Sequence, residues 1–280
     1  MSASAPPPPS SRLPGELPPD KYSAERVTWI EAVNDHLFRF RTTRYRGFRF
    51  TPGQFARLGV YRDDGPAGPR YVWRAYSIAS SSYDDFLEFY SIVVPQGEFT
   101  TRLAALQVGD EILIEKTNYG FLTTDRFPAG KQLWLLSSGT GLAPFMAILQ
   151  DLEVWATYED IVVVHSVRQP DELAYRQEIA LLAQQAGPIP EAPGAIARLH
   201  YVPIVTRTPQ AGVLTDRIPA AIANGRLEQA AGLALDPITG RAMICGNPEM
   251  VEDVRQALHA RGFAVSRRSH PGNMAVENYW

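Results

Sequence analysis

The pattern of apolar residues changes near residue 125, and no single repeating architecture accommodates both halves of the chain. Between residues 21 and 122, short apolar runs are separated by turn-forming pairs such as Pro52-Gly53 and Gly109-Asp110, a pattern that predicts strands joined by turns. From residue 131, continuously apolar runs alternate with amphipathic segments, which predicts parallel strands joined by helices. The 280 residues also exceed the size at which one hydrophobic core usually stops growing, about 250 residues. We therefore predict two domains.

The predicted fold class combines β with α/β architecture. Residues 21–124 are expected to form a six-stranded antiparallel β-barrel with one short helix at residues 101–106. Residues 131–280 are expected to form a doubly wound parallel α/β domain, with helices on both faces of its sheet. Residues 1–20 contain seven prolines and few apolar side chains, so we expect a disordered, proline-rich extension there.

Composition and charge exclude several classes of protein. No run of ~18 apolar residues is present, so we expect no membrane span, and a net charge of -3 gives no reason to expect nucleic-acid binding. Cys245 is the only cysteine, which excludes an internal disulfide and an iron-sulfur cluster held by four cysteines of this chain; no metal site is predicted. The N-terminus does not resemble a secretory signal, and we expect a cytoplasmic monomer.

The segment SSGTGLAPF, residues 137–145, follows an apolar run and opens a predicted helix. Gly139 and Gly141 would let the backbone approach a ligand closely, and the free N–H groups of a helix start favour a phosphate. Pro144 suits the first turn of that helix because its missing N–H is not needed there. The alternative is a tight strand-to-helix turn that needs glycine only for its geometry.

Two further motifs carry polar residues near predicted helix starts. In ICGNPEM, residues 244–250, Asn247 is expected to cap a helix and Cys245 to end a buried strand, at the sheet edge where ligands of such folds bind. A small buried hydrophobe is the alternative for this cysteine. In GEFTTRL, residues 97–103, Thr100 could mark a second phosphate site or simply cap a short helix.

Arginines form two further candidate features. Arg168, Arg207 and Arg217 lie after or near predicted strand ends, where they could converge on one phosphate or remain solvated in separate loops. Residues 38–50 alternate phenylalanine with arginine, as a half-exposed strand would. Its positive face is expected either to dock an acidic partner or to be merely solvated.

The segment WRAYSIAS, residues 73–80, places three polar side chains close together on one predicted strand. Arg74 and Tyr76 are two residues apart and therefore share one face, whereas strict alternation would point Ser77 to the other. If all three reach one ligand, the strand must bend near Ser77 or the ligand must lie across its end.

Taken together, these motifs resemble the ferredoxin-NADP reductase family, and the resemblance covers residues 21–280. The order and spacing of RAYS, GEFTTRL, GTGLAPF and CGNPEM carry it, and the closing AVENYW is similar to bacterial members that end in tryptophan. The resemblance implies an FAD-binding barrel at 21–124 and an NADP(H)-binding domain at 131–280 whose C-terminal segment returns to the FAD. FAD would be the bound cofactor and NADP(H) a substrate.

The resemblance also assigns site residues. Arg74 would contact the FAD diphosphate, Tyr76 the flavin and its ribityl or ribose region, and Ser77 the flavin N5. The other expected FAD contacts are Ala75, Tyr90, Ser91, Ile92, Val93, Gly97, Phe99 and Thr100, with Trp280 against the adenine. NADP(H) would be bound by Thr140, Gly141 and Cys245, and its 2′-phosphate by Arg168, Arg207 and Arg217.

Ser77 and Cys245 are the expected catalytic positions, the first through a hydrogen bond at N5 and the second by setting the approach of the nicotinamide. Glu277 is only a loose counterpart of a carboxylate in plant members, and no role is assigned to it. The expected activity is that of an FAD-dependent ferredoxin- or flavodoxin-NADP(+) reductase, with ferredoxin, flavodoxin or both as carrier. The alternatives are an electron-transfer flavoprotein subunit of a larger oxidoreductase, and an NAD(P)H-flavin reductase whose flavin is a substrate.

Overall fold

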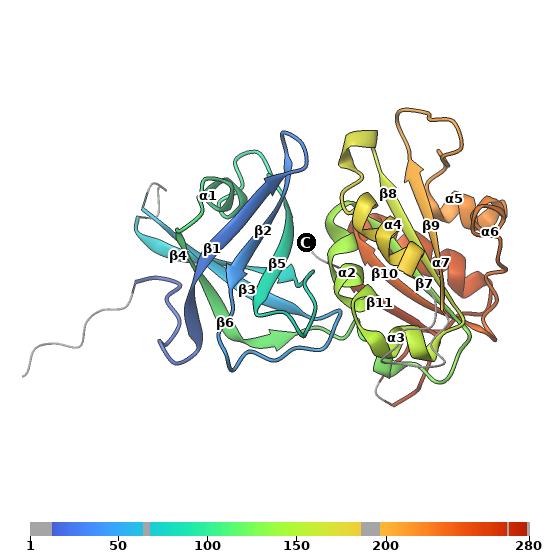
Figure 1. Ribbon diagram of the computed structural model, residues 1–280, viewed down its shortest axis with the longest axis horizontal. Helices are drawn as coiled ribbons and strands as arrows, with labels where there is room; N and C mark the ends of the chain where they lie inside the picture. Colours follow the sequence, from blue (N-terminus) through green and yellow to red (C-terminus); the bar gives the residue numbers. More distant parts are fainter. Residues whose placement is uncertain (1–12, 64–67, 186–196, 268, 279–280) are drawn as a thin grey trace, which may run out of the picture.

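The computed structural model describes residues 13–63, 68–185, 197–267 and 269–278. They form two lobes side by side, an all-β lobe from the first part of the chain and an α/β lobe from the second (Figure 1). The expected proline-rich extension at 1–20 lies mostly outside the described residues, and Trp280 lies wholly outside them.

The first lobe is a six-stranded antiparallel sheet in the order β4-β3-β6-β1-β2-β5. A bridge between Ile78 and Phe89 joins the two edge strands and closes the sheet into a barrel. The single helix that the sequence predicts in this lobe is α1, at Thr100–Ala104. The strands are β1 (Tyr22–Ala32), β2 (Leu37–Thr43), β3 (Phe55–Arg62), β4 (Arg70–Ser77), β5 (Phe86–Ile92) and β6 (Glu111–Tyr119).

The second lobe is built on a parallel sheet in the order β11-β10-β7-β8-β9. Its strands are β7 (Gln132–Ser138), β8 (Asp160–Val167), β9 (Arg198–Val205), β10 (Gly240–Gly246) and β11 (Met274–Asn278). Its helices are α2 (Ala143–Leu149), α3 (Leu152–Thr157), α4 (Arg176–Gln185), α5 (Ile218–Ala223), α6 (Arg226–Ala231) and α7 (Pro248–Ala260). Short 3-10 turns also occur in the described residues: η1 (Thr124–Arg126) between the lobes, and η2 (Gly139–Leu142) and η3 (Pro170–Glu172) in the second lobe.

Helices cover both faces of the parallel sheet. Successive side chains of its strands point to opposite sides and are apolar on both, so each face must be covered. Leu133 and Leu135 of β7 pack with residues of α2, α3 and α4, whereas Trp134 and Leu136 pack with residues of α5, α6 and α7. The predicted fold class, an antiparallel barrel followed by a doubly wound α/β domain, is therefore confirmed.

The prediction of a half-exposed, positively charged strand at residues 38–50 is wrong. In β2 the Arg39 side chain is buried and bonded to Glu88 and Glu178, and Arg41 donates to Glu88. Arg44 donates to backbone carbonyls, among them the carbonyl of Phe48. Internal partners thus take up Arg39, Arg41 and Arg44, whereas Arg46 and Arg49 lie beyond the end of β2 and are exposed.

Candidate functional site

A cavity of about 570 Å³ opens on the barrel where β4, β5 and the start of α1 meet. Ten of the eleven barrel residues that the resemblance assigned to FAD line it: Arg74, Ala75, Tyr76, Ser77, Tyr90, Ser91, Ile92, Gly97, Phe99 and Thr100. Val93 is the exception, since its side chain packs against the barrel core. Residues that sequence reasoning did not assign to this cavity also line it, namely Phe55, Val94, Glu98, Thr140, Ala143 and Asn278.

Two strands supply the polar groups at the centre of this cavity. The Tyr76 hydroxyl of β4 lies 3.0 Å from the Ser91 Oγ of β5, and the Tyr76 ring packs on Phe99, with 5.5 Å between centroids. Burial raises the pKa of Tyr76 to about 12, so its phenol is neutral at physiological pH. The centre of the cavity therefore presents a fixed pair of uncharged hydroxyls.

Ser77 lines the same cavity as Tyr76 although strict alternation would point it away. Regular β4 pairing ends at Ser77, after which the Ile78 N–H donates to the Gln54 carbonyl at 3.2 Å and Ile78 bridges to Phe89. The chain leaves the β3 ladder at this point to close the barrel. The end of the strand is thus what brings consecutive side chains to one cavity.

Gly97 and Thr100 form a tight turn at the entrance to α1. The Thr100 Oγ1 accepts from the Val94 N–H at 3.0 Å and donates to the Val94 carbonyl at 3.3 Å. It makes no capping bond to the helix, so the interpretation of Thr100 as a helix cap is wrong. A β-carbon at Gly97 would lie 2.6 Å from that hydroxyl, so any other residue would displace the Thr100 side chain.

The polar groups that line the barrel cavity fit a flavin nucleotide. Tyr90 lines the cavity and is 3% exposed, but its hydroxyl is buried without a hydrogen-bond partner among the described residues and lies toward Glu172 and Tyr201 of the other lobe. The paired hydroxyls of Tyr76 and Ser91 suit a polar ring, and the exposed Arg74 guanidinium at the rim suits a phosphate group. The cavity therefore fits an elongated ligand that carries both groups.

A second cavity, of about 390 Å³, lies at the carboxyl ends of β7, β8 and β10. The backbone of η2 packs closely on the end of β10, since a β-carbon on Gly141 would lie 2.4 Å from the Cys245 carbonyl oxygen. The Asn247 N–H donates to Ser138 Oγ at 3.1 Å, and Asn247 caps α7 as predicted. Pro144 lies in the first turn of α2, also as predicted, but the 3-10 turn η2 precedes that helix.

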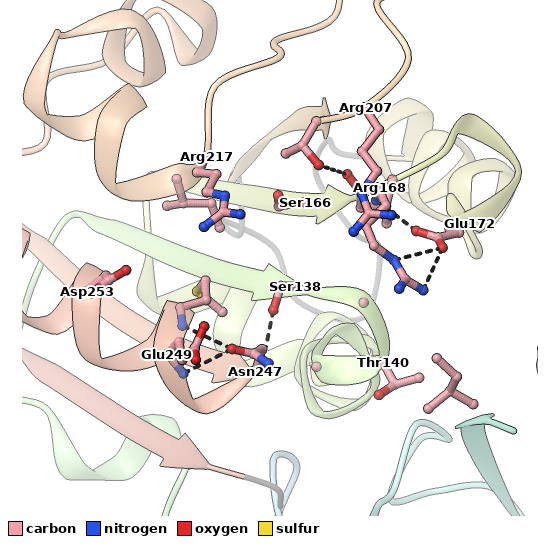
Figure 2. Close-up of a pocket in the computed structure, with 18 of the residues that line it drawn as sticks. Ser138, Thr140, Ser166, Arg168, Glu172, Arg207, Arg217, Asn247, Glu249 and Asp253 are labelled. Atoms are coloured by element: carbon pink, nitrogen blue, oxygen red, sulfur yellow. Dashed lines mark hydrogen bonds and ion pairs between the residues drawn. The ribbon is translucent and has the colours of Figure 1, made fainter. Parts of the chain in front are cut away.

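Arg168, Arg207 and Arg217 all line this second cavity. Figure 2 shows them on the side opposite Thr140 and Asn247. All three are exposed, and Arg168 is bonded to Glu172, with Nη2 3.0 Å from Oε1. The structure thus brings the three arginines to one cavity, and guanidiniums bind phosphate strongly through charge-assisted hydrogen bonds.

Sequence reasoning missed the carboxylates of the second cavity. Glu172, Glu249 and Asp253 line it together with the arginines. The helical position of Glu249 and Asp253 was visible in the sequence, but nothing there indicated that these residues face the arginines. The acidic groups balance part of the positive charge, so an incoming phosphate would compete with Glu172 for Arg168.

Cys245 lines neither of these two cavities. Its side chain is 0% exposed and packs in the apolar core on the α2 side of the sheet. Burial, with a smaller effect of Glu277, raises the pKa of the thiol well above its usual value. The thiol is therefore neutral and shielded, and its expected place beside the nicotinamide stays a prediction.

The two cavities meet at the interface between the lobes. Ile92, at the end of β5, and Thr140, in η2, line both of them. Asn278 of β11, next to the C-terminus, lines the barrel cavity from the α/β lobe. Two ligands bound in the two cavities would therefore approach each other at this junction.

Two negative findings apply to the residues that the structure describes. No helix within them combines the length and apolarity needed to span a bilayer. Within the same residues, no three histidine, cysteine, aspartate or glutamate side chains are grouped so as to hold a metal ion.

The chain is similar to known oxidoreductases in sequence and in structure. Residues 135–256 match the family described as "Oxidoreductase NAD-binding domain". The ferredoxin--NADP reductase of Azotobacter vinelandii is 41% identical over 259 residues, covering 91% of this chain and 96% of that protein. The flavodoxin/ferredoxin--NADP reductase of Rhodobacter capsulatus is 35% identical over 267 residues, covering 94% of each.

Among solved structures, a ferredoxin NADP+ reductase from Neisseria gonorrhoeae with bound FAD and NADP superposes with a TM-score of 0.84 at 36% identity. That match covers 93% of this chain and 99% of the other. Near-complete coverage in both directions extends the similarity to both lobes and to both cavities, and the chain belongs to the ferredoxin-NADP reductase family.

Proposed function

We propose that this chain is an FAD-dependent ferredoxin-NADP reductase that holds FAD in the barrel cavity and NADP(H) in the second cavity. The observation that supports the assignment is the junction of the two cavities at Ile92 and Thr140, where two bound ligands would meet. When bound, FAD supplies hydride exchange with NADP(H) and single-electron exchange with a protein carrier.

The residues of the barrel cavity orient the flavin. We infer that Tyr76 and Ser91 hold the ring region through their paired hydroxyls and that the Tyr90 side chain packs beside it. We infer that Arg74, at the rim of the cavity, contacts the diphosphate and that Ser77, the last residue of β4, forms a hydrogen bond with N5; both residues line the cavity. We infer that the turn from Gly97 to Thr100, which lines the cavity, cradles the diphosphate.

The residues of the second cavity select the nicotinamide nucleotide. Gly141 lets η2 pack directly on the end of β10, and we infer that the nucleotide lies along η2 with Thr140, which lines both cavities, near the flavin. Three arginines around one phosphate favour NADP(H) over NAD(H), since NAD(H) lacks the phosphate that would neutralise them. Arg207 and Arg217 are the principal contacts in this proposal, because Arg168 already bonds Glu172.

Ferredoxin is the proposed electron carrier, in line with the names of the relatives. A relative named for both flavodoxin and ferredoxin supports flavodoxin as a second carrier. A monomer acting in the cytoplasm is the further proposal. It rests on the sequence, and size-exclusion chromatography with light scattering tests the oligomeric state.

The decisive experiment is to purify the protein, identify its flavin after gel filtration, and reduce it anaerobically with NADPH or NADH. We expect retained FAD, rapid bleaching by NADPH, and much slower bleaching by NADH. Loss of the flavin during filtration would favour a flavin reductase that uses flavin as substrate. A colourless protein that does not bind added FAD would overturn the proposal. Reduction of a free ferredoxin by the isolated protein distinguishes an independent enzyme from a subunit of a larger oxidoreductase.

A further inference from the structure

One polar cluster between the lobes lies outside both cavities and has no role in the function proposed above. Tyr175, just before α4 of the α/β lobe, is 4% exposed and inserts against strands β2 and β5 of the barrel. Its ring lies 3.8 Å from the Arg39 guanidinium carbon, measured to the ring centroid. Its hydroxyl donates to Glu88 Oε1 at 2.9 Å.

The barrel side of this contact is held by buried ion pairs. Arg39 Nη2 lies 2.9 Å from Glu88 Oε1, and Arg39 Nη1 lies 2.5 Å from Glu178 Oε1 of α4. Arg41 also bonds Glu88, at 2.7 Å. Arg39 and Glu88 are themselves buried, so each group depends on the others for its partners. Arg39 therefore connects the two lobes through both a ring contact and an ion pair.

The same contact reaches the walls of both cavities through the β2–β5 ladder. Arg39 pairs with Tyr90 in the strand register, and two residues along the ladder Leu37 pairs with Ile92. The Tyr90 ring packs edge-on against Tyr175, at 5.6 Å and 80°. Tyr90 and Ile92 line the barrel cavity, and Leu37 and Ile92 line the second. A shift of Tyr175 would therefore displace Tyr90 and, through the ladder, Ile92 at the junction of the two cavities.

On the α/β side, Tyr175 ends the loop that carries Arg168. Within this loop the Arg168 and Gln169 N–H groups donate to Glu172, so the segment from 168 to 172 is bonded as one unit. Tyr175 has φ +60, a left-handed conformation that a β-carbon disfavours. The surrounding contacts hold this unfavourable backbone in place, and the conformation aims the ring at the barrel.

We propose that Tyr175 is a positioning residue whose ring, clamped between Arg39 and Tyr90, sets the separation of the two cavities and hence the approach of the nicotinamide to the flavin. The expected effect on the reaction rate rests on the proposed function, whereas the contact between Tyr175 and the barrel does not depend on it. Tyr175 touches no reacting atom in this scheme. It acts through Tyr90 on one side and through the Arg168 loop on the other.

The test compares Tyr175→Ala and Tyr175→Phe in the FAD-loaded protein, with Tyr158→Ala as control for loss of another buried tyrosine of the same lobe. Because a misplacement of 1 Å can cost about 100-fold in rate, Tyr175→Ala should lower the limiting rate of flavin reduction at saturating NADPH by about tenfold or more. Tyr175→Phe keeps the ring and should restore the rate to within about threefold of the native protein, since only one hydrogen bond is lost. FAD retention should not change.

Hydrogen exchange measured on the same proteins, with and without FAD, gives a readout that does not depend on turnover. Tyr175→Ala should accelerate amide exchange in residues 168–175 and in β2 and β5, whereas Tyr158→Ala should leave these segments protected. An unchanged limiting rate in Tyr175→Ala, an equal loss in Tyr175→Phe, or an equal loss in Tyr158→Ala would each overturn the proposal. If NADPH fails to reduce even the native protein, the proposed function is wrong. The exchange data would then still show whether Tyr175 holds residues 168–175, β2 and β5 together.

Discussion

The two cavities are built in different ways, although they meet at Ile92 and Thr140. The barrel cavity takes most of its lining from two strands and one turn, whose side chains are fixed by the sheet register and by contacts such as Tyr76 with Ser91. The second cavity is lined largely by residues that follow strands, and its arginines are exposed. The lining of the first is therefore mainly uncharged, whereas in our proposal the second uses charge to select its ligand.

The largest effect that would test this difference is expected from the arginines. Replacing both Arg207 and Arg217 by alanine should lower kcat/KM for NADPH by about 10³-fold, since each charge-assisted hydrogen bond is worth about 1.5–3 kcal/mol. NADH should be affected much less because it lacks the 2′-phosphate. Steady-state kinetics with both nucleotides measure this, with Arg198→Ala as a control that removes an exposed arginine paired to Asp160 elsewhere in the lobe. Equal losses for both nucleotides would contradict charge-based selection.

Acid should weaken the α/β lobe at the base of the second cavity. His165 is fully buried, and its Nε2 lies 3.1 Å from the Gly139 carbonyl oxygen. Burial lowers the pKa of His165 to about 4. The neutral ring therefore stabilises the fold fully above pH 6.5, and this contribution is lost as the pH falls toward 4. At about 1.4 kcal/mol per pKa unit, the loss reaches about 3 kcal/mol by pH 4.

Urea unfolding at pH 7 and pH 4 measures the effect of this histidine. The variant His165→Gln, which cannot titrate, is the matched control and should show a smaller loss between the two pH values. If the native protein and the variant lose the same free energy of unfolding, His165 is not the group responsible.

The glycines of the two cavities should differ in their tolerance of a side chain. At Gly141 a β-carbon would meet the backbone of Cys245, which cannot move without displacing β10. Gly141→Ala should therefore cost about 2 kcal/mol of unfolding free energy. At Gly97 the nearest obstacle is the Thr100 hydroxyl, so Gly97→Ala should cost about half as much. Denaturant unfolding compares the two, and the reverse order would contradict this account.

A smaller effect on catalysis than that of the arginines is expected inside the barrel cavity. Ser77→Ala should slow flavin reduction by NADPH about tenfold, the value of one hydrogen bond, while FAD stays bound because the other contacts remain. Stopped-flow single-turnover reduction measures the rate, and Ser80→Ala removes a nearby buried hydroxyl that bonds Glu88 and Phe86 instead. An unchanged rate in Ser77→Ala would remove this serine from the proposed chemistry.

The barrel and the doubly wound lobe were predictable because hydrophobic periodicity reports which faces of an element are buried. The same periodicity misled at residues 38–50, because it cannot show that the outer face of β2 is covered by the other lobe and that Arg39 meets Glu88 and Glu178 there. The expected helix cap at Thr100 was also wrong, because its hydroxyl bonds the preceding turn at Val94 instead. Both errors concern which partner a polar group takes.

The sequence by itself determined the two-domain architecture, the strand–glycine–helix turns, and the residue types of both cavities, since these follow from local spacing and side-chain chemistry. Only the tertiary structure decided which polar groups face each other. It brought Arg168, Arg207 and Arg217 to one cavity, turned Ser77 to the same side as Tyr76, buried Cys245, and inserted Tyr175 between the lobes. The physical reason is that these contacts join residues far apart in the chain, or depend on where a strand leaves its ladder, and local sequence carries no record of either.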